Sequence, residues 1–333
     1  MAIEGMSLLM GRDVPTSFGS SFFIKTFLPG FVASILYSYA VMPIIACSFW
    51  ASLTVASKLI LWIISGIVVG MAIASLDLYI YQFFEGINWP KPVWNWRYGS
   101  IKRHFKNIDN ELENLKKRYE VIMQKKELKE EDKKELLEIN HKRSKLWAEV
   151  RKFPYNPDKG SYSRRYPDEA TIFGNVRAEY EGYSEKQYGM HMMVFWQHLW
   201  LILPKELKEE LDLRGAKADF LVYLSFIFLI YAPIGGIGFY FQRNTWASIL
   251  TYDIPLGAII CFFISIVLCF FVYYVSISTH KTYGRYIKAV FDLYRFDLAQ
   301  KLKIDVTGKS ISDDTERKNW RKYQKYLLDY KKP

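Results

Sequence analysis

Four long stretches of this chain contain no charged side chain, and they limit what it can fold into. They are 31, 18, 23 and 27 residues long and cover residues 27–57, 59–76, 220–242 and 254–280. A helix needs about 20 apolar residues to cross a hydrocarbon layer of about 30 Å, because each residue adds about 1.5 Å. Apolar helices in the cores of soluble proteins are shorter. The sequence therefore predicts a polytopic membrane protein and excludes a soluble globular enzyme as the first interpretation.

The cysteines agree with this interpretation. All three, Cys47, Cys261 and Cys269, fall inside the apolar stretches. Small secreted domains that depend on disulfides place their cysteines in loops around a minimal core. The sequence therefore excludes a secreted disulfide scaffold.

Charge between the apolar stretches predicts the topology. Residues 91–214 hold 26 Lys and Arg against 21 Asp and Glu, and residues 281–333 hold 14 against 7. Basic residues close to the ends of spans stay on the cytosolic side. Lys58 and Arg243 are the only basic residues expected on the other side. We therefore expect both termini and the long insertion to be cytosolic.

These patterns divide the chain into five parts, and none of them shows the alternation typical of strands. We expect an all-α membrane protein with spans near residues 27–49, 57–81, 220–241 and 254–278. The predicted parts are a cytosolic or interfacial arm (1–26), spans 1 and 2 (27–85), an inserted cytosolic helical domain (86–216), spans 3 and 4 (217–279) and a basic cytosolic helical tail (280–333).

The inserted domain opens with two apolar seams. In residues 101–122 apolar side chains recur at alternating spacings of four and three, which is the heptad pattern of a coiled coil. A second seam covers residues 136–153, and an almost wholly charged run at 125–134 separates the two. We predict a charged coiled-coil hairpin over about 100–153, with one helix about 80 Å long as the alternative. A motif region at 154–215 follows.

No constellation in the sequence indicates catalysis, a metal or a cofactor. His191 and His198 are two helical turns apart and lack nearby cysteines or paired carboxylates, whereas zinc needs three or four ligands. Nucleotide-binding glycine loops and a Gly-x-Ser-x-Gly elbow do not occur. We expect no enzyme activity, no metal and no cofactor.

Two features of the predicted spans bear on assembly and conduction. Gly66, Gly70 and Ala74 form a ridge of small residues that permits close helix packing, either between subunits or against span 1 or 4. Asp77, one turn further on, faces either the interior of the bundle or the membrane surface. Glu85 is expected to be solvated.

Span 3 contains a second feature of this kind, at Pro233, Gly235 and Gly236. A proline removes one backbone hydrogen bond, and glycines permit a bend. This stretch is either a break that lines a pore or the outer end of the helix.

A cluster of cations and tyrosines follows the second seam. Aromatic side chains beside arginines suit base stacking combined with phosphate contacts. Attraction to anionic lipid headgroups is the other interpretation of the basic charge, and the one that we favour. The candidate ligand-binding residues are Lys159, Tyr162, Arg164, Arg165, Tyr166 and Arg177.

Several motifs are similar to those of a family of uncharacterised prokaryotic polytopic membrane proteins. They are the Gly-Asn pair at 174–175, Tyr-Gly at 188–189, Leu-Pro at 203–204 and the segment Asp-Leu-Tyr-Arg-Phe-Asp-Leu at 292–298. Ala170 stands where that pattern commonly has proline. The resemblance implies an architecture and a prokaryotic inner membrane, but no activity.

The leading functional hypothesis is an oligomeric channel or pore-forming effector that is gated through its cytosolic domain. A nucleotide or nucleic acid is the candidate ligand, in a phage-defence setting by analogy of architecture. The alternative is a non-conducting scaffold that docks a cytosolic protein on the hairpin. A third, weaker hypothesis is an enzyme acting on lipid through His191, His198 and Asp77. The expected partners are the lipid bilayer and further copies of the chain.

Overall fold

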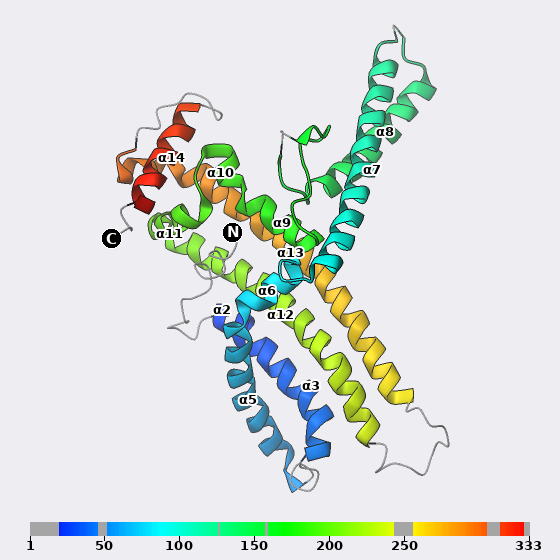
Figure 1. Cartoon of the computed structure of the whole chain (residues 1–333), viewed down its shortest axis with the longest axis vertical. Coiled ribbons are helices and arrows are strands. Elements are labelled where there is room, and N and C mark those ends of the chain that lie inside the picture. The colour runs from blue at the N-terminus through cyan, green and yellow to red at the C-terminus, as the bar shows by residue number, and fades with distance from the viewer. Residues whose placement is uncertain are drawn as a thin grey trace. The chain divides into compact units, whose positions relative to one another are not determined.

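A computed structural model describes residues 20–45, 52–125, 127–156, 159–242, 256–304 and 314–329 (Figure 1). Every regular element in these ranges is a helix, which confirms the predicted all-helical class, and one isolated antiparallel bridge joins Tyr155 to Arg165. The chain forms two compact units. Unit 1 comprises residues 1–81 and 204–283, and unit 2 comprises residues 82–203 and 284–333. Cys47 and Arg243 lie outside the described residues.

Unit 1 contains the apolar helices. Four of the described helices are long and apolar enough to cross a membrane, as the sequence predicted. Span 1 consists of α2 (Ser20–Phe22), the π-helical turn η1 (Phe23–Phe27) and α3 (Leu28–Ile45). The other three are α5 (Val55–Ser75), α12 (Lys205–Gln242) and α13 (Leu256–Leu302), of which α13 supplies residues to both units.

The ends of these helices differ from the prediction. Span 1 begins at Ser20 rather than near Phe27, because the count of uncharged residues stopped at Lys25, which the helix includes. Span 2 ends at Ser75, and a turn at Leu76 leads into α6 (Asp77–Glu85). The two compact units divide at 81/82, 203/204 and 283/284.

Spans 1 and 2 pack closely through glycines. A β-carbon on Gly30 would lie under 3.0 Å from backbone atoms of Gly66 and Gly70. Small residues allow two helix backbones to approach in this way, and packing is the main attraction between helices in lipid. Farther along the pair, the Trp62 indole donates a hydrogen bond of 2.9 Å to the Ser38 hydroxyl.

The predicted break in span 3 is not observed, and neither is an end of the helix at that point. Helix α12 continues through Pro233 to Gln242. Pro233 is exposed, and Gly235 is buried where a β-carbon would meet the Tyr231 ring and the Cys261 sulfur. The glycine therefore serves contact with span 4, within one chain.

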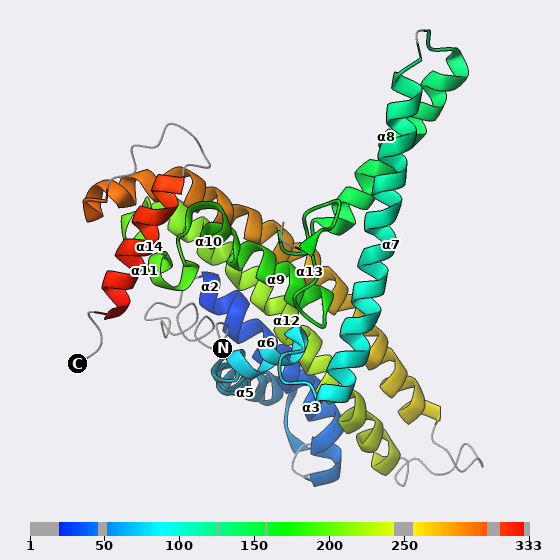
Figure 2. The same cartoon turned by 45° about the horizontal axis from the view of Figure 1, so that its top comes forward.

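In unit 2, α7 (Lys91–Met123) and α8 (Glu130–Val150) lie side by side (Figures 1 and 2). The charged run covers the link and the first turn of α8, and Lys125 Nζ of the link lies 2.5 Å from Asp132 Oδ1 of α8. Six of the seven seam positions in residues 101–122 are buried. The heptad pattern therefore predicts the buried face of α7.

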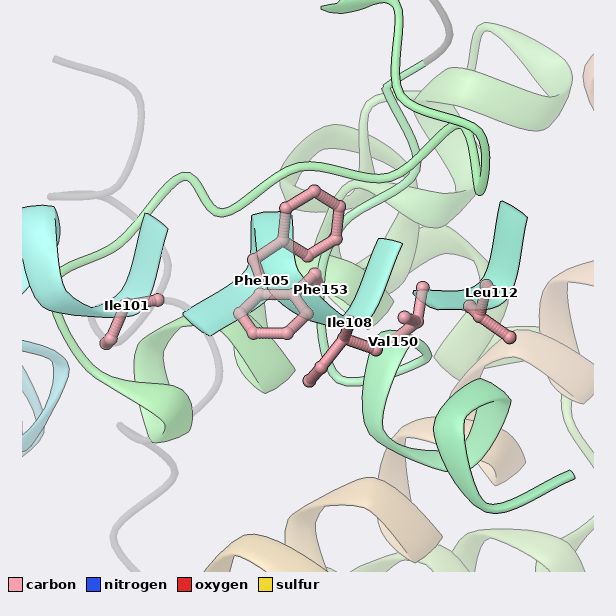
Figure 3. Close-up of a cluster of buried hydrophobic side chains, with 6 residues drawn as sticks. All are labelled: Ile101, Phe105, Ile108, Leu112, Val150 and Phe153. Atoms are coloured by element: carbon pink, nitrogen blue, oxygen red, sulfur yellow. The ribbon is translucent and has the colours of Figure 1, made fainter. Parts of the chain in front are cut away.

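The main apolar cluster of this helix pair joins the first half of α7 to the end of α8, away from the link (Figure 3). Rings of Phe105 and Phe153 meet edge to face at 5.1 Å, and Leu112 and Val150 are fully buried. Tyr162 and Tyr166 of the following loop pack against the same cluster. The loop is therefore part of the packed structure of unit 2.

Three short helices and a tail helix complete unit 2. They are α9 (Ile172–Glu181), α10 (Tyr183–Tyr188), α11 (Met192–Ile202) and α14 (Asp314–Asp329). The tail helix buries Trp320 completely, with its ring 5.1 Å from that of Phe195. Arg295 of α13 lies 3.1 Å from Glu316 of α14, and both side chains are buried.

Candidate functional site

Unit 1 contains an ion pair between two of its spans. Lys25 Nζ lies 2.7 Å from Asp219 Oδ2, and the side chains are 26% and 18% exposed. Lys25 belongs to the π-helical turn of span 1, and Asp219 belongs to α12. Single π-helical turns occur frequently at functional sites, because they shift the direction of the side chains that follow.

The other two spans add polar groups to the same pair. Tyr81, on the α6 continuation of span 2, donates its hydroxyl hydrogen bond to Asp219 Oδ1. The same hydroxyl lies 3.3 Å from His280 Nε2 on α13, and the two rings meet edge to face at 5.8 Å. Tyr81 and His280 are buried. Spans 1, 3 and 4, and the helix α6 that follows span 2, therefore each supply a side chain to one hydrogen-bonded cluster.

Asp77 joins a neighbouring contact in this unit. Its Oδ1 accepts a hydrogen bond of 2.7 Å from the Tyr223 hydroxyl, and Tyr223 on α12 is fully buried. Tyr223 lies one helical turn from Asp219, so the two contacts are adjacent on α12. Asp77 is therefore partly buried and hydrogen-bonded to a side chain of span 3. We call Lys25, Asp77, Tyr81, Asp219, Tyr223 and His280 the polar cluster.

The polar cluster is costly for a membrane protein to maintain. Removing a carboxylate and an ammonium from water costs several kcal/mol per ion in a real protein, and their attraction repays this only with good geometry and further hydrogen bonds. Ionisable groups at membrane depth usually line pathways for ions or protons, or pair inside the bundle. The cluster is therefore the candidate site of unit 1.

The glycine ridge predicted for assembly faces the same chain. A β-carbon on Gly70 would lie under 3.0 Å from the Thr26 carbonyl group, and one on Gly66 would lie 3.0 Å from the Phe31 α-carbon. Ala74 is half-buried. Of the two predicted roles, packing against span 1 is the one observed for Gly66 and Gly70.

Two of the predicted ligand-binding arginines are held by carboxylates instead. Arg177 is buried, pairs with Glu85 through Nη1, and has Nη2 2.7 Å from Glu181 Oε1. Arg165 donates a 2.5 Å hydrogen bond to the Phe153 carbonyl and has Nη1 3.2 Å from Glu179. Both guanidinium groups are therefore engaged by partners within unit 2, and ligand binding by them stays a prediction.

The sequence predicts a solvated Glu85, and this prediction is wrong. Glu85 is only 4% exposed and pairs with Arg177.

The remaining predicted ligand residues have different surroundings. Arg164 is exposed and has a left-handed backbone, with φ of 54°. Lys159 is exposed, and its Nζ lies 5.7 Å from the centre of the Tyr166 ring. Asp109 of α7 fixes the loop that contains these residues, because its carboxylate accepts hydrogen bonds of 2.8 Å from the backbone amides of Tyr162 and Ser163. Both tyrosines are partly covered by packing.

One carboxyl group of unit 2 has a raised pKa. Burial, together with the nearby charges of Glu85, Asp168 and Glu181, raises the pKa of Glu169 to about 7. Both effects disfavour the ionised form. Glu169 is therefore a group of unit 2 that titrates near neutral pH.

Sequence reasoning found Asp77 and missed the other members of the polar cluster. Tyr81, Asp219 and His280 lie at or beyond the inner ends of the predicted spans, where charged and aromatic residues are usual. A signal was present nonetheless. Lys25 and Asp219 carry opposite charges immediately before the uncharged stretches of spans 1 and 3.

Within the described ranges, no group of three or more His, Cys, Asp and Glu side chains is arranged to hold a metal ion. His191 immediately precedes α11, and His198 lies within it. A comparison with known proteins gives no relative, since no family model, curated protein or solved structure matches this chain.

Proposed function

We propose that this chain is an ion-conducting membrane protein, an oligomeric channel or pore-forming effector, and that the polar cluster closes its ion path at the inner ends of the spans. The observation that carries the proposal is the Lys25–Asp219 pair, to which Tyr81 and His280 also contribute. A partly buried pair of this kind is a weak source of stability, because its desolvation offsets its attraction. Its occurrence in a bundle of apolar spans is better explained by a function.

A closed pair of opposite charges suits a gate. While Lys25 and Asp219 satisfy each other, neither attracts a passing ion, and when they separate, each presents a charge to the path. Rings of such charges give channels their selectivity. One subunit has only four spans, so we propose that several copies surround the path.

Gating is proposed to come from unit 2, placed in the cytosol of a prokaryotic cell together with both termini. Helix α13 supports this, because it carries His280 and also supplies residues 284–302 to unit 2. A nucleotide ligand in a phage-defence setting stays a prediction. Among the predicted cations, Lys159 and Arg164 are the exposed ones and would carry it.

Planar-bilayer recordings of the purified full-length chain test the proposal. Asp219→Asn removes the charge that holds Lys25, and we expect conductance at conditions where the parent is closed. Glu209→Gln is the matched control, because it neutralises an exposed carboxylate on the same helix whose nearest lysine nitrogen, that of Lys205, is 3.8 Å away. Absence of conductance from the parent and from Asp219→Asn, with and without nucleotides, would rule out a channel.

A second candidate function is a non-conducting scaffold. Large apolar side chains are exposed around the link between α7 and α8, namely Val121, Met123, Leu128 and Leu137. Exposed apolar patches mark protein-binding surfaces. Replacing Val121 and Leu137 by serine should abolish recovery of a specific partner with the purified protein, whereas a channel would keep its conductance.

A further inference from the structure

We propose that the first three turns of α7, residues 91–103, form a binding surface for anionic lipid headgroups at the membrane–water interface. The proposal is independent of ion conduction. It assigns a lipid surface as the partner of a helix face that unit 2 leaves uncovered.

The exposed face of this segment carries apolar groups that unit 2 does not bury. Val93 and Trp96 are 45% and 68% exposed, and they lie three residues apart, hence on one side of the helix. Gly99 follows on that side, and no atom lies within 4 Å of where its β-carbon would be. Tryptophan is enriched at membrane interfaces, because its ring is apolar and its indole N–H seeks a polar partner.

The opposite face of the same turns is packed into unit 2. Trp94 and Tyr98 stack with ring centres 4.6 Å apart, and the Tyr98 hydroxyl donates a 3.1 Å hydrogen bond to the Pro167 carbonyl. Ile101 and Phe105 are buried. The segment is therefore amphipathic in a fixed orientation, and Trp96 is on its uncovered side.

Basic residues of the same turns are also exposed to solvent. Lys91, Lys102 and Arg103 are exposed and Arg97 is partly exposed, whereas residues 91–103 contain no acidic side chain. Arg103 follows Trp96 by two helical turns, on the same side. Each basic residue near an anionic surface adds to the attraction.

The segment is also close to a span along the chain. Helix α5 of span 2 ends at Ser75 and α7 begins at Lys91, with only α6 and a short turn between them. Sequence neighbours of a span end lie near the headgroup layer. An amphipathic helix with lysines, arginines and tryptophan lies in that layer with its apolar side toward the acyl chains.

A labelling experiment on the full-length protein tests this surface. In a chain with Cys47, Cys261 and Cys269 changed to serine, Trp96→Cys carries an environment-sensitive fluorophore. The protein is reconstituted in vesicles of phosphatidylcholine, alone or mixed with phosphatidylglycerol, with brominated acyl chains as the quencher. Val121→Cys is the matched control, because Val121 is 64% exposed on the same helix but about 38 Å away at 1.5 Å per residue.

We expect the brominated lipid to quench the label at Trp96 strongly and the label at Val121 weakly. Phosphatidylglycerol should increase the quenching at Trp96, and adding Arg97→Glu and Arg103→Glu should remove that increase. Equal, weak quenching at both positions would overturn the proposal and would leave a protein contact as the cover of this face. Quenching that does not respond to phosphatidylglycerol would overturn the anionic preference.

A second measurement does not depend on the cysteine substitutions. In the parent chain, Trp96→Phe should reduce the part of the tryptophan fluorescence that brominated lipid quenches. An unchanged quenchable fraction would also contradict the proposal.

Discussion

Substituting Gly70 by alanine is expected to destabilise unit 1, because a backbone group stands where the new methyl would lie. A β-carbon at this position would be under 3.0 Å from both the carbonyl carbon and the carbonyl oxygen of Thr26, and neither atom can rotate away. Spans 1 and 2 would have to separate. Overpacking typically costs about 1–3 kcal/mol, and a rigid obstacle places this site at about 3 kcal/mol.

The higher helix propensity of alanine offsets up to about 1 kcal/mol, which leaves a loss of about 2 kcal/mol. For a domain of this size, the midpoint of thermal unfolding should fall by roughly 4–8 °C. Gly66→Ala should cost less, since the nearest atom there is 3.0 Å away. Gly99→Ala has no atom within 4 Å and should stabilise the protein slightly.

Thermal unfolding in detergent, followed by size-exclusion chromatography, measures this series, and light scattering reports the oligomeric mass. The reasoning requires the order Gly70→Ala, Gly66→Ala, Gly99→Ala from least to most stable. It would be refuted if Gly70→Ala kept the parent's unfolding midpoint. Dissociation of an oligomer without loss of stability would instead assign the ridge to a contact between subunits.

Three other predictions concern unit 2. The pKa of Glu169 is about 7 in the folded chain against an ordinary value of 4.5, so the folded state binds the proton more tightly than the unfolded state. The free energy of unfolding should therefore fall as pH rises between these two values. Chemical denaturation across this pH range should show that slope in the parent and not in Glu169→Gln. Arg295→Met leaves the Glu316 carboxylate buried without its cation and should lower the free energy of unfolding by about 3–5 kcal/mol. Hydrogen exchange in residues 314–329 should then be faster than in the parent. Equal protection in the two proteins would contradict this role of Arg295. Arg164→Gly should leave the free energy of unfolding unchanged or raise it by up to about 1 kcal/mol, because the backbone φ of 54° at this position suits glycine. The same denaturation assay measures this. A clear loss of stability would show that the Arg164 side chain makes stabilising contacts.

The sequence allowed the spans to be predicted because the signal is local. An uncharged stretch of about 20 residues can satisfy its backbone in lipid only as a helix, whatever surrounds it. The seam of residues 101–122 was equally direct, because its spacing selects one face of a helix. Ile101, Phe105 and Leu112 are buried in agreement with that spacing.

The partners of charged residues could not be predicted in the same way. Arg177 meets Glu85 across 92 residues of sequence, and Tyr81 meets His280 across 199. Composition therefore favoured a solvated Glu85 and a ligand-binding Arg177, although each satisfies the other. The span estimate failed at Lys25 for the same reason, because the charge that ended it is paired with Asp219 inside the bundle.

The most direct test of the central claim is ion flux into liposomes from a chain in which the two charges are exchanged. If the Lys25–Asp219 pair closes the path, Lys25→Met and Asp219→Asn should each raise the flux above that of the closed parent. The exchanged pair, Lys25→Asp with Asp219→Lys, should restore the low flux at an unchanged oligomeric mass. Equal flux from the parent, both single variants and the exchanged pair would contradict the claim that this pair is the gate.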